Sequence, residues 1–283
     1  MAAGRLAIAG AIVFSVMLAR RGLRVHDPAT ELRLVLAGLA LATHFACWIA
    51  SLRYTSVAVS TLLVTTTPVF TEIAEVARTR RMRPLAAASI LLALAGVAIV
   101  TLPHGATAAT GLEEARPLLG AGLALIGAVA IGAYLLLVRA SDARYGTLAV
   151  VGRTYAVAAV VLIAAAAVAG EGPPAPSNGA AWAGIVAMAL VSQLYGHTAF
   201  NAAVRTFSAT FVSMTTLAEP IVAALLAAWL FHEALGRTTL AGAALVFLGI
   251  AVALRDEARR PGAAEGGRGG GEGALGATRR GRK

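Results

Sequence analysis

The chain contains nine long apolar runs separated by short segments rich in arginine, glycine or proline. A helix crosses the hydrocarbon core of a bilayer with about 20 apolar residues, whereas a membrane strand needs an alternating pattern that these runs lack. The runs predict an all-α polytopic membrane protein with about nine transmembrane helices. We expect spans at Gly4–Ala19, Leu32–Leu52, Ser56–Ala77, Leu85–Leu102, Leu118–Val138, Thr147–Ala169, Ala181–Phe200, Ser208–Phe231 and Thr238–Leu254.

Composition agrees with a chain whose main partner is a lipid bilayer. Hydrophobic residues make up 58% and charged residues 13% of 283 residues, whereas a soluble chain carries about 25% charged residues. The net charge of +10 does not indicate nucleic-acid binding, because the arginines lie in loops and in the tail. No nucleotide-binding, zinc or nucleophile motif is visible, so we expect no cofactor, no metal and no enzyme activity.

Basic residues also predict the topology. Counted over alternating loops, eighteen Arg and Lys lie on one side and four on the other. Cytoplasmic loops carry the excess, so we expect a cytoplasmic C-terminus and, with nine spans, an external N-terminus. The glycine- and arginine-rich tail, 255–283, is expected to be disordered. A single Lys among 24 basic residues suggests a GC-rich bacterial source, and hence the cytoplasmic membrane.

The sequence repeats itself at an offset of about 150 residues. Leu52–Ser56 matches Val204–Ser208, and Pro68 and Pro220 each follow the matched serine by twelve residues. An odd number of spans separates the copies, so they face opposite ways, as in many secondary transporters. We expect a first repeat at 1–103, an external linker at 104–117 and a second repeat at 118–254.

These segments resemble the EamA-like family of the drug/metabolite transporter superfamily. The resemblance rests on Leu52–Ser56 through Pro68, and on Ala218–Leu226 through the corner His232-Glu233-Ala234-Leu235. It implies ten helices in two inverted five-helix repeats, and export or uptake of small metabolites. The chain departs from the family by lacking the first helix: either this protein has lost that helix, or the true start codon lies upstream, which the expected external N-terminus favours. It also carries Arg80-Arg81 and His232-Glu233 where the family usually has Gly-Glu.

Ionisable groups inside a bilayer are costly and mark functional sites. Glu219 lies near the middle of the eighth span, directly before Pro220, where it could bind a proton or a cationic solute. Glu72 is a second candidate; its alternative role is pairing with Arg78 or Arg80.

Other polar residues lie at similar depths. His44 in the second span could face a cavity or pack between helices. Gln193, His197 and Asn201 form a stripe on the seventh span that faces either the solute path or neighbouring helices. Tyr134 could line the same cavity or lie at the membrane interface.

Matched threonines, including Thr66 and Thr216, precede the two prolines. They could serve the solute site, or satisfy backbone groups that the prolines free.

Together these features predict a secondary transporter, with export favoured, that moves a small-molecule substrate by alternating access and is coupled to a proton or solute gradient. The alternatives are a membrane-embedded enzyme, which would gather acid, His and Ser or Cys at one depth, and a non-transporting membrane subunit. A homodimer is left open.

Overall fold

A computed structural model describes residues 2–19, 27–105, 116–141, 145–231 and 236–259, and these residues are predominantly helical. The elements in chain order are α1 (Ala2–Ala19), α2 (Pro28–Ser51), α3 (Val57–Val64), α4 (Thr67–Thr79), α5 (Pro84–Gly105), α6 (Pro117–Arg139), α7 (Thr147–Val168), α8 (Gly179–Ala187), the π-helix η1 (Met188–His197), α9 (Thr198–Ala203), α10 (Ala209–Thr215), the 3₁₀-helix η2 (Thr216–Ala218), α11 (Glu219–Phe231) and α12 (Arg237–Ala258).

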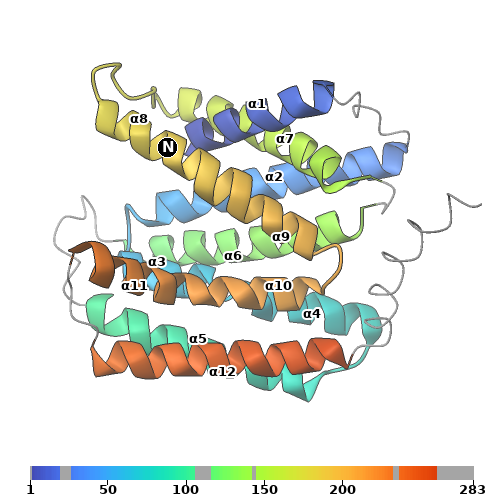
Figure 1. Ribbon diagram of the computed structural model, residues 1–283, viewed down its shortest axis with the longest axis vertical. Helices are drawn as coiled ribbons and strands as arrows, with labels where there is room; N and C mark the ends of the chain where they lie inside the picture. The colour runs from blue at the N-terminus through green and yellow to red at the C-terminus, as the bar shows by residue number, and fades with distance from the viewer. Residues whose placement is uncertain (1, 20–26, 106–115, 142–144, 232–235, 260–283) are drawn as a thin grey trace, which may run out of the picture.

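Each of the nine expected spans is occupied by helix, and the protein is a polytopic membrane protein (Figure 1). Seven helices within the described residues are long and apolar enough to cross a bilayer. The other two spans are α3 with α4, and α10 with η2 and α11. Each falls short as a single helix because it is broken near its proline.

The two broken spans begin in the same way. Ser56 and Ser208, the matched serines of the repeat, are the N-caps of α3 and α10, with ψ of 151° and 152° and φ of −66° in both. Each side chain accepts a hydrogen bond from the backbone N–H three residues later, which stabilises the first helical turn. The two spans run in opposite directions (Figure 1), as an inverted repeat requires.

The helices α1 and α7 occupy corresponding positions in the two predicted repeats, and so do α5 and α12. Within each of these pairs the two helices pack directly against each other. Glycine permits the close approach of α5 and α12. A Cβ added to Gly96 would lie 2.6 Å from the Gly242 carbonyl oxygen, and one added to Gly249 would lie 2.8 Å from the Ser89 carbonyl oxygen.

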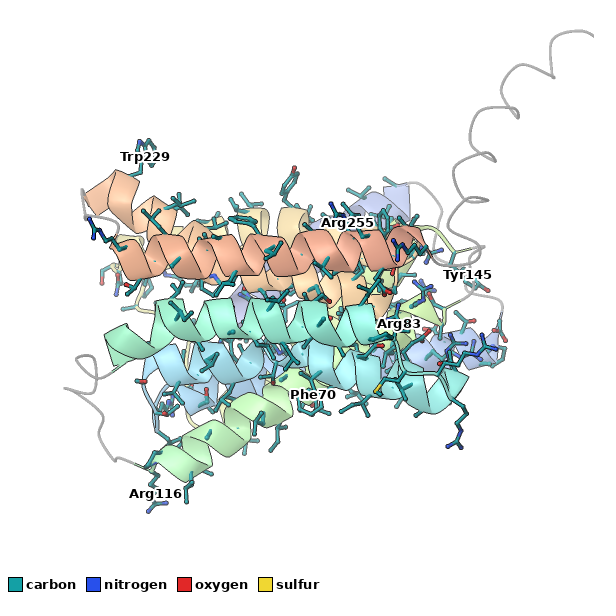
Figure 2. All side chains as sticks on the ribbon, turned by 90° about the horizontal axis from the view of Figure 1, so that it is seen from below. Phe70, Arg83, Arg116, Tyr145, Trp229 and Arg255 are labelled. Carbon is teal, nitrogen blue, oxygen red and sulfur yellow. The ribbon has the colours of Figure 1, made fainter. Side chains whose placement is uncertain are left out.

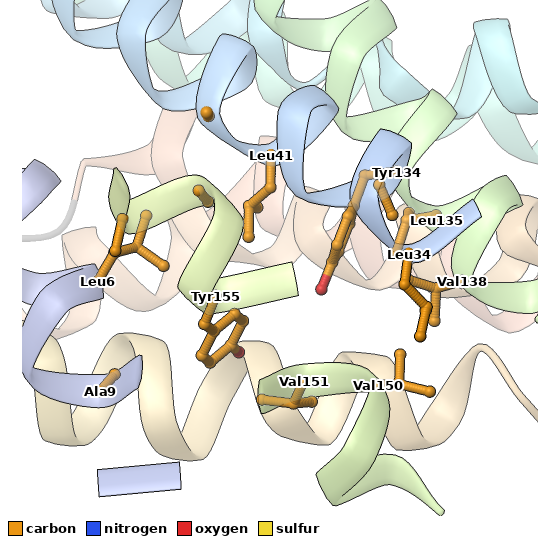
Figure 3. Packing of buried hydrophobic residues seen from close by; sticks show 14 of the residues in the cluster. Leu6, Ala9, Leu34, Leu41, Tyr134, Leu135, Val138, Val150, Val151 and Tyr155 are labelled. Atoms are coloured by element: carbon orange, nitrogen blue, oxygen red, sulfur yellow. The ribbon is translucent and has the colours of Figure 1, made fainter. Parts of the chain in front are cut away.

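Most of the apolar core lies among α1, α2, α6 and α7 (Figure 3). Leu6, Leu34, Leu41 and Tyr155 are fully buried there. A second, smaller cluster joins α5, α10 and α12.

The bundle has two chemically different ends. Arg83, Tyr145 and Arg255 lie together at one end, and Arg116 and Trp229 at the other (Figure 2). We call these the Arg83 end and the Arg116 end. The corner 80–83, which carries three arginines, belongs to the Arg83 end.

Some expected boundaries are shifted. The span expected to end at Leu102 continues through Pro103 to Gly105; a proline in the last turn removes only one backbone hydrogen bond. The expected tail begins later than 255, because α12 continues to Ala258. Residues 260–283 of that tail, 106–115 of the linker and the corner 232–235 lie outside the described residues.

Candidate functional site

A cavity of about 170 Å³ lies between the two predicted repeats. Both repeats contribute to its wall, and its polar and charged side chains come from six of the nine spans. The lining residues are Arg5, His44, Phe45, Trp48, Val64, Thr65, Thr67, Ile131, Tyr134, Leu135, Ser192, His197, Phe200, Val212, Thr216 and Glu219.

Glu219 is the acidic residue of this wall and the first residue of α11. It retains accessible surface and interacts electrostatically with Arg5, which α1 brings to the same cavity. No ion pair within 4.0 Å joins the two among the described residues. The site therefore holds one acid and one base that face a shared space without neutralising each other in direct contact.

The two helix breaks are built from threonines. Proline lacks an N–H, so Pro68 leaves the Val64 carbonyl without its helical partner, and the Thr67 hydroxyl donates to that oxygen at 2.9 Å. At the second break the backbone N–H of Glu219 bonds the Thr216 carbonyl, which Pro220 would otherwise leave free. At the first break a threonine hydroxyl, that of Thr67, satisfies the carbonyl that the proline frees, and at the second break a backbone N–H does so.

Thr216 lines the cavity and Thr66 does not, although its neighbours on both sides do. The Thr66 hydroxyl donates to the Leu63 carbonyl at 2.6 Å, and the Thr216 hydroxyl to the Ser213 carbonyl at 2.7 Å. Matched positions therefore make matched local bonds, while only one of them faces the solute space.

The residues of the polar stripe on the seventh span do not all line the cavity. His197 faces the cavity, and its ring meets Phe45 edge-on at 5.4 Å. Asn201 is fully buried, accepts from the Tyr134 hydroxyl at 2.6 Å and donates to the His197 carbonyl at 2.7 Å. Gln193 is fully buried but does not line the cavity. A π-helix carries His197 and Gln193, and such segments occur often at functional sites.

His44 combines its two expected roles. Its ring lines the cavity, and its Nδ1 lies 2.9 Å from the Gly127 carbonyl oxygen. Because a carbonyl only accepts, Nδ1 carries the proton and Nε2 of the neutral ring is left as an acceptor. The ring also stacks on Trp48, with 5.9 Å between centroids.

Glu72 does not line this cavity. Its carboxylate binds Arg83 at 2.5 Å and accepts from the Thr210 hydroxyl at 3.1 Å. Arg83 in turn binds Asp256 at 2.7 Å. The expected pairing with Arg78 is made by Glu75 instead, at 2.8 Å. Glu72 is thus part of a closed polar network at the Arg83 end.

Larger hollows flank the central cavity. One of about 260 Å³ lies between α1, α2 and α7 toward the Arg116 end and shares Phe45 with the central cavity. Another, of about 930 Å³, lies at the Arg83 end and includes Arg83 and Asp256 in its wall. The two hollows share no lining residue, and the Glu72–Arg83–Asp256 network contributes Arg83 and Asp256 to the wall of the hollow at the Arg83 end.

Arg5 is not among the site residues predicted from the sequence, where it is counted with the loop charges. It is a buried residue of α1, and the centre of its guanidinium lies 3.8 Å from the centroid of the Phe45 ring. The available signal was its place inside the first apolar run, only four residues from the start of the chain. Ser192 and Phe45 were also missed, since nothing in their local sequence distinguishes them from lipid-facing neighbours.

A helical membrane bundle with a central polar cavity between oppositely directed repeats defines the class of multi-pass membrane transporters. The sequence profile of the EamA-like transporter family matches residues 1–102 and 118–255. The chain belongs to the EamA-like transporter family, a group of membrane transporters in the drug/metabolite transporter superfamily.

Two other comparisons bear on the fold. A solved crystal structure, described only as that of a protein, aligns with a TM-score of 0.73 and 22% sequence identity. The alignment covers 91% of this chain and 87% of the other. No curated protein matches in sequence. The structural likeness therefore supports the fold alone.

Proposed function

We propose that this protein is a secondary transporter that carries a small solute across the cytoplasmic membrane by alternating access, with the solute held in the central cavity. The observation that carries the proposal is the pair Arg5 and Glu219, facing one cavity between two oppositely directed repeats. Charged groups at such depth are rarely kept without a functional reason.

Glu219 is the proposed proton site. It lies at the proline break of α11, where the helix is locally loosened, and its carboxylate has no ion-pair partner within 4.0 Å among the described residues. A proton taken up there changes the charge of the cavity, so proton binding and solute binding are linked. The sequence has no nucleotide-binding motif, which favours a gradient as the energy source.

The proposed orientation places the Arg83 end in the cytoplasm. The arginine-rich corner of residues 80–83 and the end of α12 lie at that end, and cytoplasmic loops carry the excess of positive charge (Figure 2). Export is the proposed direction, from the Arg83 end toward the Arg116 end.

The test is flux through the purified chain in liposomes that contain a pH-sensitive dye. Individual labelled organic acids, amines and neutral metabolites are supplied in a gradient, and solute and proton movement are recorded together. We expect wild-type protein to move protons with at least one solute, and Glu219→Gln to abolish that proton movement.

Glu171→Gln is the matched control, because Glu171 forms an exposed ion pair with Arg53 and does not line the central cavity, and exposed pairs contribute little. It should transport normally. Unchanged proton coupling in Glu219→Gln, or wild-type protein that moves none of the solutes, would contradict the proposal.

A further inference from the structure

The Arg5 guanidinium is a buried charge with unused hydrogen-bond donors. Only 6% of Arg5 is exposed, and its Nε and one terminal nitrogen have no hydrogen-bond partner within the described part of the chain. One face is covered by the Phe45 ring at 3.8 Å. A cation–π contact offsets part of the desolvation cost, but it uses the π-face and leaves the N–H donors in the guanidinium plane unpaired.

A second unpaired donor lies in the same wall. The indole Nε1 of Trp48 is buried and lacks a partner in the described residues, and Trp48 lines the cavity with Arg5. Buried polar atoms are nearly always satisfied in a functional state. The buried cavity-lining atoms without a partner in the described residues are the N–H donors of Arg5 and Trp48, so a ligand that satisfies these two side chains must supply acceptor atoms.

We propose that Arg5 anchors the carboxylate of a small organic monoanion, and that Trp48 donates to the same end of that solute. This rests on the proposed transport function and names its substrate class. The planar guanidinium fork binds a carboxylate through two parallel N–H···O bonds.

Charge balance in the cavity limits the anion to a single charge. The titratable groups in the wall are Arg5, Glu219, His44, His197 and Tyr134. Arg5 is the one permanent cation among them, and Glu219 repels added negative charge. When Glu219 is protonated, as proposed for the proton site, one guanidinium matches one carboxylate, whereas a doubly charged phosphate would exceed the available positive charge.

The cavity also sets the size and character of the rest of the solute. An apolar cavity of about 150 Å³ holds one benzene molecule, and this cavity measures about 170 Å³. Phe45, Trp48 and Phe200 provide aromatic walls, and Ile131 and Leu135 provide aliphatic ones. The space therefore suits one ring or a short chain attached to the carboxylate.

The experiment titrates the purified full-length chain with benzoate, phenylacetate and nicotinate, and with benzamide and benzylamine as ligands of similar size without the negative charge. Trp48 reports binding through its fluorescence in a background that carries Trp182→Phe and Trp229→Phe. We expect saturable changes with at least one carboxylate, and at least tenfold weaker binding of the uncharged amide and of the amine.

Variants then locate the anion. Arg5→Gln should weaken carboxylate binding at least tenfold, and Arg5→Lys should retain part of it, since it keeps the charge and loses the fork. Glu219→Gln should bind at least as tightly as wild type, because it removes a repelling charge. Arg53→Gln, at an exposed arginine, should not differ from wild type.

Several results would overturn the assignment: no binding of any of the three carboxylates, equal binding of benzamide, preference for benzylamine, or unchanged binding in Arg5→Gln. If Arg5→Gln fails to fold, as judged by gel filtration, Arg5→Lys supplies the comparison, and wild-type affinity there would contradict a bidentate fork.

Binding and transport are measured separately. Carboxylate binding without flux would leave the Arg5 anchor standing and contradict the transport proposal. Proton-coupled flux of another solute class, without carboxylate binding, would contradict the anchor alone.

Discussion

The two broken spans begin alike and differ in what they do with their glutamate. Both start at a serine N-cap, break at threonines and contain a proline twelve residues after the serine. Glu72 follows Pro68 by one turn, and its carboxylate is closed into contacts with Arg83 and Thr210. Glu219 precedes Pro220 and faces the cavity without a direct ionic partner in the described residues.

The difference shows that depth in the membrane does not by itself assign a role to an ionisable group. A carboxylate whose acceptor positions are filled stabilises the fold, and its charge is not available to a solute. A carboxylate that faces an open space keeps that charge available to a solute. The rest of the structure must then offset the free-energy cost of holding a charge inside the membrane. The comparison between the two broken spans can be tested by replacing the polar and charged groups of each span and measuring the change in stability.

The largest effect is expected from Arg83→Met. This change leaves Glu72 and Asp256 without the cation that joins them, in a region where all three side chains are mostly buried. Breaking such a network costs about 3 kcal/mol. Unfolding in mixed micelles with increasing SDS measures the loss.

Arg78→Met is the control, because Arg78 pairs with Glu75 while 72% of its side chain is exposed. Exposed pairs contribute about 0.5 kcal/mol or less. Equal losses in the two variants would show that the network is not a stabilising element.

A smaller effect is expected from Glu72→Gln. The amide keeps the shape of the side chain and one acceptor oxygen but loses the charge that binds Arg83, at a cost of about 2 kcal/mol. Glu219→Gln, the same chemical change in the other broken span, should leave the SDS midpoint close to that of wild type. If Glu219→Gln were the more destabilising of the two, the roles assigned to the glutamates would have to be exchanged.

Much of this arrangement could be predicted from the sequence. Hydropathy located all nine spans, and the prolines marked both breaks, because a missing N–H is a local property of the chain. Glu219 could be placed near the middle of its span by counting from Ser208. Local signals therefore sufficed for the fold and for one charged residue of the cavity wall.

The partners could not be predicted, because they depend on tertiary contacts. Arg5 lies next to the start of the chain, where hydropathy does not separate a loop charge from a buried one, and its contact with Phe45 joins two different helices. The binding of Glu72 to Arg83 depends on how the corner after α4 turns back. The π-helix that carries His197 has no proline or other local mark in its sequence.

The smallest effect is expected where the two broken spans touch. The Thr71 hydroxyl of α4 and the Ser213 hydroxyl of α10 lie 3.2 Å apart and are buried. Each also donates to a carbonyl of its own helix, at 3.1 and 2.9 Å. Because a hydroxyl has one proton, the local bond and the bond between helices compete, and the coupling should be near the average for membrane helices, about 0.6 kcal/mol.

A double-mutant cycle with Thr71→Val and Ser213→Ala isolates this coupling from the loss of the local bonds. Thr101→Val is the matched control, since the Thr101 hydroxyl is buried and donates to the Val97 carbonyl of its own helix at 2.8 Å. Its cycle with Ser213→Ala should give no coupling. Coupling for Thr71 well above 1 kcal/mol would mean that the spans are joined mainly through their hydroxyls. Stability would then depend on the contact between the broken helices as much as on the network around Glu72, and the contrast between the two glutamates would explain less of it.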